Sequence, residues 1–375
     1  MTVTVYRELS IGTVLLALLF VGCETGSNKS VTGDYFDRSP GELTSINAGL
    51  DSLTVFRENT GEFSSMFAGK YKNTTAFSVI EFPKPATELL DSLEQATVII
   101  KVSDTWRDGD ADFALYETVS TWSDSARLDP DMFTSTGSPI VSFSDTASAL
   151  DSLEFRLSDE IINNMRSWSG PGSFKVCGTE TGKTMVNLYS WNSSSIPSIE
   201  YIYRKTAGAL DTTTTECLKT NYYFDTGFDS KLHDSKFTVL VADADVRGFK
   251  IKLPLPDSLP ATASINKCSI TFSVSETMVP SGNTFYIGIY QLDEPTETFI
   301  DASYESSNSI EQAVVAGMEF FEADITSFVT AWRIKNAANY SILVRPLQTG
   351  ETPSYIVFSP PDSVSIIYSI LPEVE

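Results

Sequence analysis

Four aspartates within nine residues form the densest set of potential metal ligands in this sequence. Asp104, Asp108, Asp110 and Asp112 lie on either side of a glycine in the segment Asp-Thr-Trp-Arg-Asp-Gly-Asp-Ala-Asp. Carboxylate oxygens are the ligands that Ca²⁺ prefers, although this spacing is not that of an EF-hand loop. The segment is consistent with two interpretations, a weak calcium site or a solvated acidic turn. No other cofactor is expected.

Catalytic chemistry has little support in the sequence. The chain has one histidine, His233, in a polar segment typical of a solvated loop, and a Ser-His-Asp triad or a zinc hydrolase would depend on it. HExxH, CxxC, P-loop and GxGxxG patterns do not occur. Many pairs of acids could be drawn for glycoside hydrolysis, but no motif singles one out. As oxygen ligands for Ca²⁺, Asp243 and Asp245 are candidates at a level similar to or weaker than the four aspartates. We predict that the protein is not an enzyme.

Tryptophans are the candidates for contacts with sugars. Trp106, Trp122 and Trp191 lie in or beside polar segments that read as loops, where exposed rings stack on sugars. The alternative interpretation is that these three rings cover the ends of a hydrophobic core. Trp168 and Trp332 fall on apolar stripes of helical period, so we expect them in the core.

The four cysteines have different predicted roles. Cys268 shares the apolar parity of a strand-like segment and is expected to be a buried small side chain. Cys177 and Cys217 are a candidate disulfide outside the cytoplasm, although their geometry cannot be judged from sequence. Cys23 follows an apolar run near the start of the sequence.

Residues 1–22 read as a signal peptide, with an apolar region over 11–21 that is short for a membrane-spanning helix. Gly22 precedes Cys23, and this junction resembles the lipobox of bacterial lipoproteins, with Phe20 where that motif prefers Leu. The resemblance implies lipidation of Cys23, membrane attachment through the lipid, and a location in the bacterial outer membrane or at the cell surface. An ordinary signal peptide with an incidental cysteine, or an uncleaved anchor, is the alternative.

Composition limits the class of partner. Removal of residues 1–22 would leave 353 of the 375 residues, which is enough for two domains. The net charge of −23 disfavours binding to nucleic acids and anionic surfaces. Polycations, divalent cations and neutral glycans are compatible with it. An apolar content of 42% is sufficient for packed cores.

An internal duplication divides the chain. Five segments recur in the same order, with offsets of 164 to 174 residues: 80–85 with 251–256, 92–103 with 264–275, 113–116 with 287–290, 161–168 with 325–332, and 181–190 with 349–359. We therefore predict a tether over 23–49, a first domain over 50–204, a linker over 205–217 and a second domain over 218–371.

Each copy alternates with period two over most of its length, and Gly, Asp and Pro turns separate the segments. This pattern predicts an all-β class with two tandem jelly-roll or β-sandwich domains. One segment in each copy, 161–168 and 325–332, has a helical period instead. Asp159 and Asp324 precede these segments and are expected to cap one short helix per domain.

The order of these segments resembles the DNRLRE (disaggregatase-related) β-sandwich domains of secreted and surface proteins of prokaryotes. The motifs are the Ile-x-Phe-Pro-like strand, the Asp-led helix ending in Trp, and the closing strand Pro197–Tyr203, whose counterpart at 360–368 is less regular. The resemblance covers 50–204 and 218–371, and the counterpart of Trp122 is missing from the second copy. It implies a carbohydrate-binding-type fold that is mostly non-catalytic.

Three functions follow from these observations. The first is a lipid-anchored, non-catalytic surface protein that uses two sandwiches for carbohydrate binding or adhesion. The second is a structural or assembly subunit of the envelope that binds another protein through an exposed sheet face or edge. The third and most remote is a polysaccharide-degrading enzyme.

Overall fold

The computed structural model describes residues 43–49, 52–57, 61, 63–118, 122–123, 128–133, 139, 141–145, 150–206, 208–227, 239–244, 247–253, 258–292, 304–335, 341–347, 350–359 and 363–370. Cys23, His233 and Asp245 lie outside these residues, and so do the predicted signal peptide and the proposed site of lipidation. Within the described residues, no helix has both the length and the apolar character needed to cross a bilayer.

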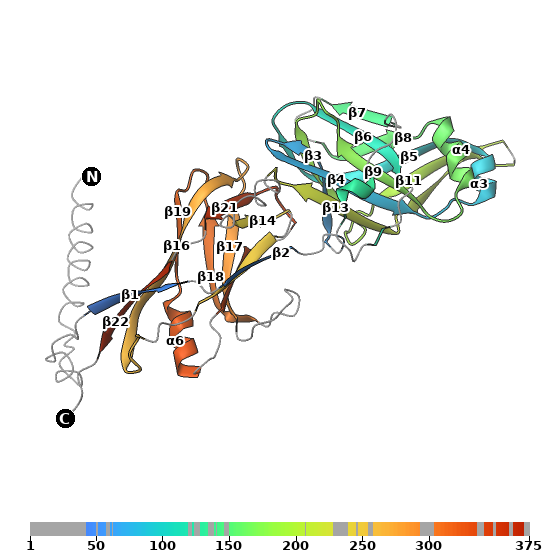
Figure 1. Ribbon diagram of the computed structural model, residues 1–375. Coiled ribbons are helices and arrows are strands. Elements are labelled where there is room, and N and C mark those ends of the chain that lie inside the picture. Colours follow the sequence, from blue (N-terminus) through green and yellow to red (C-terminus); the bar gives the residue numbers. More distant parts are fainter. Residues whose placement is uncertain are drawn as a thin grey trace, which may run out of the picture.

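The described chain forms two antiparallel β structures that lie end to end (Figure 1), which confirms the predicted all-β class. We call the first one sandwich 1. It contains eleven strands: β3 (Ser65–Tyr71), β4 (Thr74–Phe82), β5 (Leu93–Arg107), β6 (Ala111–Thr118), β7 (Val141–Asp145), β8 (Ser152–Arg156), β9 (Gly172–Gly178), β10 (Thr184–Tyr189), β11 (Ser198–Arg204), β12 (Leu210–Glu216) and β13 (Lys219–Asp225).

Sandwich 2 also contains eleven strands. They are β1 (Leu43–Gly49), β2 (Ser52–Arg57), β14 (Val239–Ala242), β15 (Arg247–Lys252), β16 (Ala263–Met278), β17 (Phe285–Leu292), β18 (Tyr304–Val314), β19 (Phe320–Asp324), β20 (Ser341–Pro346), β21 (Tyr355–Ser359) and β22 (Ser363–Ile370).

The two sandwiches have the same strand order, which is the arrangement expected of a duplicated unit. Sandwich 1 runs β12-β11-β5-β10-β3-β4-β9-β6-β7, with β8 on β5 and β13 on β4. Sandwich 2 runs β1-β22-β16-β21-β14-β15-β20-β17-β18, with β19 on β16 and β2 on β15. Every strand of one therefore has a counterpart at the same place in the other.

Each sandwich contains two strands that lie, in the sequence, directly before the strands of the other sandwich. β1 and β2 precede sandwich 1 along the chain, but β1 pairs with β22 and β2 pairs with β15 in sandwich 2. β12 and β13 precede sandwich 2, but they pair with β11 and β4 in sandwich 1. The two repeats thus exchange their first strand pairs, and neither sheet is complete without residues from the other repeat.

This exchange changes the expected boundaries. Residues 43–49 of the expected tether form β1, and residues 210–216 of the expected linker form β12. β13, expected to begin the second domain, belongs to sandwich 1. The threonine run of β12 alternates between exposed Thr212 and Thr214 and half-buried Thr213 and Thr215. β-Branched residues with this alternation favour a strand at a sheet edge over a loop.

The predicted helices are present. α4 (Asp159–Ser167) and α6 (Thr326–Lys335) occupy equivalent places after β8 and β19. The cap of α4 differs from the expectation, because Ser158 accepts the bond from the Ile161 amide and Asp159 is already in the first turn. Asp324 does accept from the Thr326 amide at 3.0 Å. Sandwich 1 also has two short helical segments: α3 (Thr87–Asp91) and the 3-10 turn η1 (Pro130–Phe133).

The cores follow the alternation in the sequence. Val98 and Ile100 of β5, and Ile270 and Phe272 of β16, are fully buried. Cys268 is also fully buried, as expected.

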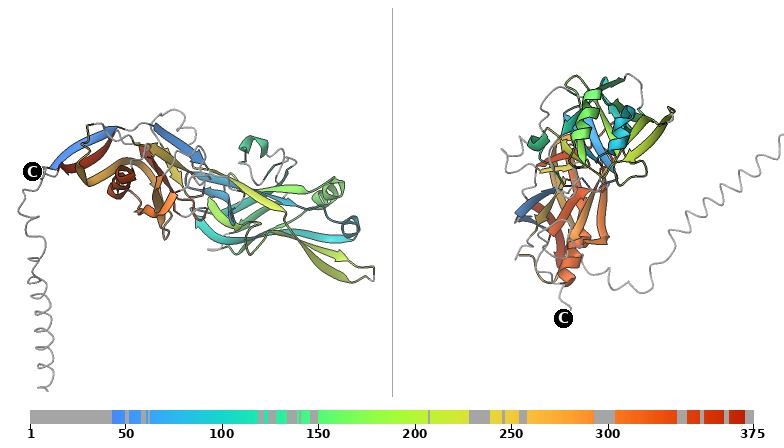
Figure 2. Two further views of the ribbon diagram at one scale, coloured as in Figure 1. Left: turned by 90° about the horizontal axis from the view of Figure 1, so that it is seen from below. Right: turned by 90° about the vertical axis from the view of Figure 1, so that its right-hand side faces the viewer.

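The two sandwiches meet at a junction, and Figure 2 shows the molecule from two further directions. Met278 and Tyr355 of sandwich 2 pack in the same buried cluster as the core of sandwich 1. The Tyr222 hydroxyl donates to the Ala244 carbonyl at 2.5 Å, and the Ser65 hydroxyl donates to the Gly350 carbonyl at 2.5 Å. Buried apolar packing together with paired polar groups makes the junction a specific contact.

Candidate functional site

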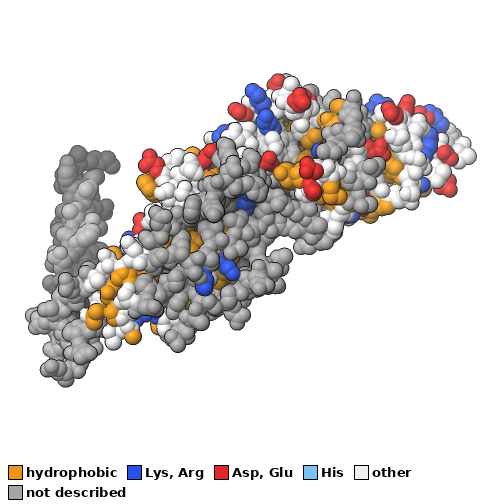
Figure 3. Space-filling view, in the orientation of Figure 1, with side chains coloured by type: hydrophobic (Ala, Val, Ile, Leu, Met, Phe, Trp, Pro, Cys, Tyr) orange, Lys and Arg blue, Asp and Glu red, His pale blue; other side chains and the backbone are white. Residues whose placement is uncertain are grey.

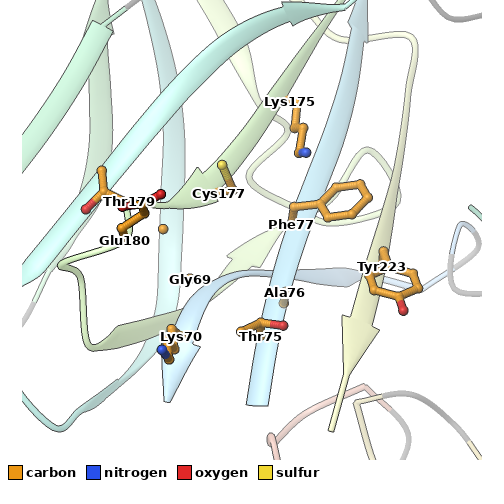
Figure 4. Close-up of a pocket in the computed structure, with 11 residues that line it drawn as sticks. Gly69, Lys70, Thr75, Ala76, Phe77, Lys175, Cys177, Thr179, Glu180 and Tyr223 are labelled. Carbon is orange, nitrogen blue, oxygen red and sulfur yellow. The ribbon is translucent and has the colours of Figure 1, made fainter. Parts of the chain in front are cut away.

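A groove of about 320 Å³ crosses the outer face of sandwich 1 (Figure 4). Strands β3, β4, β9 and β13 supply most of its walls. One of the exchanged strands, β13, supplies Tyr223 to the groove. The lining residues are Gly69, Lys70, Thr75, Ala76, Phe77, Lys175, Cys177, Gly178, Thr179, Glu180 and Tyr223.

An aromatic wall stands on one side of the groove. The rings of Phe77 and Tyr223 are stacked, with centroids 5.4 Å apart and planes at 25°. Lys175 Nζ lies 4.4 Å from the Phe77 centroid and donates to the carbonyl of Phe133 at 2.7 Å. Burial lowers the pKa of Lys175, and the neighbouring Cys177 opposes this shift. Lys175 therefore holds the wall in place by a cation–π contact and a hydrogen bond.

Polar groups line the opposite side. The Thr179 hydroxyl donates to Asp112 Oδ2 at 2.6 Å, and the Thr181 hydroxyl donates to the same oxygen at 3.0 Å. The Gly182 amide in turn donates to Thr179 Oγ1 at 3.2 Å. Asp112 thus organises the loop after β9 and places Glu180 beside the groove.

Two glycines form the floor. Gly69 has a φ of +109°, and a Cβ there would overlap the carbonyl oxygen of Thr184. A Cβ at Gly178 would lie 2.9 Å from the Gly69 Cα. Only glycine permits this backbone conformation and this close approach of β3 and β9. The floor of the groove therefore consists of backbone atoms, and side chains border it.

This combination of groups suits a ligand rich in hydroxyls. Lys70, Thr75 and Glu180 offer donors and acceptors around an apolar wall, which is the usual character of a ligand site. Among the described lining residues, Glu180 is the one carboxylate. A two-carboxylate hydrolysis therefore has no matching pair of side chains in this groove.

The structure places the three candidate sugar-stacking tryptophans at separate positions. Trp106 is 5% exposed, lies in the junction, and donates from Nε1 to Asn283 Oδ1 at 3.2 Å. Trp122 is half-buried and donates to Ser173 Oγ at 3.2 Å, with Lys219 Nζ 4.5 Å from its ring centroid. Trp191 is half-buried and donates to the Gly61 carbonyl at 3.1 Å. They do not form a common platform, and none lines the groove.

Sequence reasoning missed Phe77 and Tyr223, the aromatic residues that do line the groove. Only tryptophans beside polar segments were considered as rings for sugar contacts, so these two residues were passed over. The outer cluster of Phe77, Val79, Leu128 and Phe133 shows that this face of β4 is partly covered. A useful signal was apolar residues at both parities of β4, which predicts cover on both faces of a strand.

The four aspartates do not assemble a calcium site. Within the part of the chain that the structure describes, no group of three or more His, Cys, Asp or Glu side chains could hold a metal ion. Asp104 accepts a bond from the Thr105 amide at 2.8 Å, and Asp112 binds two threonine hydroxyls. Asp108 and Asp110 are exposed. Asp104 belongs to the long strand β5 and therefore lies away from the turn that contains Asp108 and Asp110.

The candidate disulfide is a wrong prediction. Cys177 and Cys217 are both free thiols. Cys177 belongs to the outer cluster of sandwich 1, whereas Cys217 packs against its inner core. The two side chains therefore lie on different faces, which a disulfide cannot bridge. Burial raises the pKa of both thiols, that of Cys217 to about 12.

Asp243 has a role that the sequence did not reveal. This residue is 2% exposed beside the junction, and its Oδ2 accepts from the Thr352 amide at 2.8 Å and the Thr352 hydroxyl at 2.7 Å. Burial raises its pKa to about 7, although these hydrogen bonds favour the ionised form. Asp243 shapes the turn whose Gly350 and Glu351 carbonyls accept from Asn187 of sandwich 1 at 3.4 and 3.1 Å.

Comparisons with known proteins found little similarity. No family model matches the sequence, and no curated protein matches it. Among solved structures, a major pilin subunit of Bacillus cereus aligns with a TM-score of 0.22 and 8% identity. The alignment covers 73% of this chain and 56% of the pilin chain. The fold described above rests on the strand pairings alone.

Proposed function

We propose that this chain is a lipid-anchored, non-catalytic protein of the bacterial outer membrane or cell surface that binds carbohydrate in the groove of sandwich 1. The observation that carries this proposal is the groove itself, where the Phe77–Tyr223 wall faces Lys70, Thr75 and Glu180. An apolar ring edge beside converging donors and acceptors matches the alternating CH and OH surfaces of a neutral sugar. The resemblance to DNRLRE domains is in keeping with this class of ligand.

A glycan array with the purified mature chain tests the ligand class, and titration with the best polysaccharide gives its affinity. The variants Lys70→Gln and Glu180→Gln each remove one charged group from the rim, and we expect each to weaken binding about tenfold. Lys101→Gln changes an exposed lysine on β5 outside the groove and should bind like the unmodified chain. Equal affinity of all three variants would exclude the groove, and an array without binding would exclude carbohydrate.

The anchor has its own test. Metabolic labelling with an alkyne palmitate analogue should tag the protein, and the tag should be lost in Cys23→Ala. Cys268→Ala is a matched control, because this cysteine is fully buried and should not affect labelling. Unchanged labelling of Cys23→Ala would exclude lipidation at this position.

One observation favours the second candidate function, an assembly subunit that binds another envelope protein. β12 ends the strand order of sandwich 1 and pairs, within the described residues, with β11 alone. An edge strand of this kind can accept a strand from a partner. A photo-crosslinking amino acid at exposed Thr212 or Thr214 should then capture a discrete protein in whole cells. Capture of the protein from a photo-crosslinker at position 101, and not from positions 212 or 214, would argue against β12 as the binding edge.

A further inference from the structure

The proposed lipid connects to sandwich 2 and not to sandwich 1. The first described strand after Cys23 is β1, which begins at Leu43 and pairs with β22 of sandwich 2. Nineteen residues separate Cys23 from Leu43, and they can span at most about 65 Å. The exchange of strand pairs therefore ties the N-terminal segment to the C-terminal sandwich. This inference rests on the proposed lipidation.

Leu43 lies at the end of sandwich 2 that is far from the junction. It pairs with Ser369, which pairs with Ser264 near the start of β16. The other end of β16 is Met278, which packs in the junction. A strand rises about 3.3 Å per residue, so Leu43 is on the order of 45 Å from the junction. Figures 1 and 2 show β1 and β22 at this outer end, with α3 and α4 at the opposite end of the molecule.

Exposed apolar side chains gather at this outer end. Ile334, at the end of α6, is 81% exposed, and Ile370, at the end of β22, is 46% exposed. Both lie next to Ala263, which pairs with Ile370 and, together with Ile334, lines a hollow of about 320 Å³. We call Ala263, Arg333, Ile334 and Ile370 the end surface. Figure 3 shows hydrophobic side chains at this end of sandwich 2.

Arg333 keeps the end surface rigid and positively charged. Its guanidinium donates to the carbonyls of Ala263 at 2.5 Å, Ala261 at 2.7 Å and Pro260 at 3.1 Å. An isoleucine pair beside a fixed guanidinium matches the boundary between acyl chains and phosphate head groups. Two isoleucines alone give weak affinity, so such a surface works only where another group already holds the protein at the bilayer.

We propose that the end surface contacts the lipid bilayer, so that sandwich 2 stands next to the membrane and sandwich 1 carries the groove outward. The order of the two sandwiches from the membrane is then the reverse of their order in the chain. Sandwich 1 reaches further from the bilayer by the length of sandwich 2, and a ligand can approach the groove without meeting the lipid surface.

The experiment uses the lipidated full chain in vesicles of phosphatidylcholine and phosphatidylethanolamine, which carry no net charge. An environment-sensitive NBD label is attached to Ile334→Cys or Ile370→Cys, and for comparison to Glu88→Cys in α3, an exposed position at the opposite end. The native thiols should react slowly at neutral pH, because burial raises their pKa. The unmodified chain, labelled in parallel, gives the background.

We expect the labels at 334 and 370 to shift to the blue and to lose most of their fluorescence when nitroxide-labelled lipids are added, and the label at 88 to remain unchanged. Quenching at 88, or at none of the three positions in vesicle-bound protein, would overturn this inference and leave the proposed anchor intact. Vesicle binding that persists in Cys23→Ala would contradict the anchor, and the inference would fail with it.

Discussion

Asp112 and Trp106 show how a residue chosen for its chemistry can have a structural role. Asp112 was a candidate calcium ligand, and it instead accepts two threonine hydroxyls that shape one rim of the groove. Trp106 was a candidate sugar platform, and it instead packs 5.8 Å from the Phe67 ring and bonds to Asn283 across the junction. In both residues the side chain is satisfied by contacts with segments that are remote in sequence.

Asp243→Asn should change how stability depends on pH. The pKa of Asp243 is about 7 in the folded protein against an ordinary value of 3.8, so between these values the folded state holds a proton that the unfolded chain has lost. The contribution of this carboxyl to stability is therefore full below about pH 4, falls as pH rises towards 7, and is lost above it. Urea unfolding of both proteins from about pH 4 to about pH 8 measures this difference.

The asparagine variant removes that decline, so its free energy of unfolding relative to the unmodified chain should rise across the window. Asp131→Asn, at an exposed position in η1, is the control and should run parallel to the unmodified chain. Parallel curves for Asp243→Asn as well would contradict the role assigned to this carboxyl.

The number of free thiols in the protein can be measured directly. Denatured protein without reductant should show three reactive thiols besides Cys23, because Cys177, Cys217 and Cys268 are free. In the folded protein they should react slowly at neutral pH, since burial raises the pKa of Cys217 and of Cys268 to about 12. Titration with a thiol reagent with and without denaturant measures both. A count of one would restore the Cys177–Cys217 disulfide.

The exchanged strand pairs are the elements that complete both sandwiches. β13 contributes Tyr222 and Phe224, which are 1% and 2% exposed, to the core of sandwich 1. β2 occupies the equivalent place in sandwich 2, where Val55 pairs with Phe249 and Leu53 pairs with Ile251. Because each pair adds one strand to each of two sheet edges, its loss leaves both edges without hydrogen-bond partners.

Deletion of residues 43–57 should therefore damage the sandwich that is distant in sequence. We expect amide hydrogen exchange in β15 and β22 to lose most of its protection, while β4 and β11 keep theirs, because their partners β13 and β12 remain. Deletion of residues 24–42 is the control and should leave both sandwiches protected. Loss of protection in β4 and β11 instead would contradict the exchange.

The whole molecule is elongated, and hydrogen bonds and buried packing at the junction hold its two sandwiches together. Asn187 is 5% exposed, and its amide bridges from sandwich 1 to the carbonyls of Gly350 and Glu351. Tyr222 belongs to an exchanged strand and also bonds across the junction. The strand exchange and the junction therefore share Tyr222, and each stabilises the other.

Asn187→Ala should loosen this junction. The variant removes both hydrogen bonds of the Asn187 amide while Ser65 still donates to the Gly350 carbonyl, so we expect a cost of about 1 kcal/mol. We expect the two sandwiches to reorient more independently, which small-angle scattering detects as a broader distribution of maximum dimensions. Asn266→Ala removes an exposed amide at the outer end of sandwich 2 and should leave the scattering unchanged. An identical profile for Asn187→Ala would show that the hydrogen bonds of Asn187 do not fix the junction.

The sequence by itself determined the features that depend on local side-chain patterns. Alternation in segments such as 96–102 and 268–274 gave the strands and their buried faces, and the helical stripes ending at Trp168 and Trp332 gave α4 and α6. The recurrence of segments gave the duplication. These features follow from side-chain periods of two and 3.6, which can be read within one segment.

Only the tertiary structure decided which segments pair. The sequence of β1 is compatible with a place in either repeat, and its pairing with β22 is fixed by the approach of strands far apart in the chain. The groove depends on the same long-range choice, because β13 brings Tyr223 beside Phe77 of β4. A strand's pattern states which face is apolar but not which edge it joins, so the exchange, the junction and the groove could not be read from sequence.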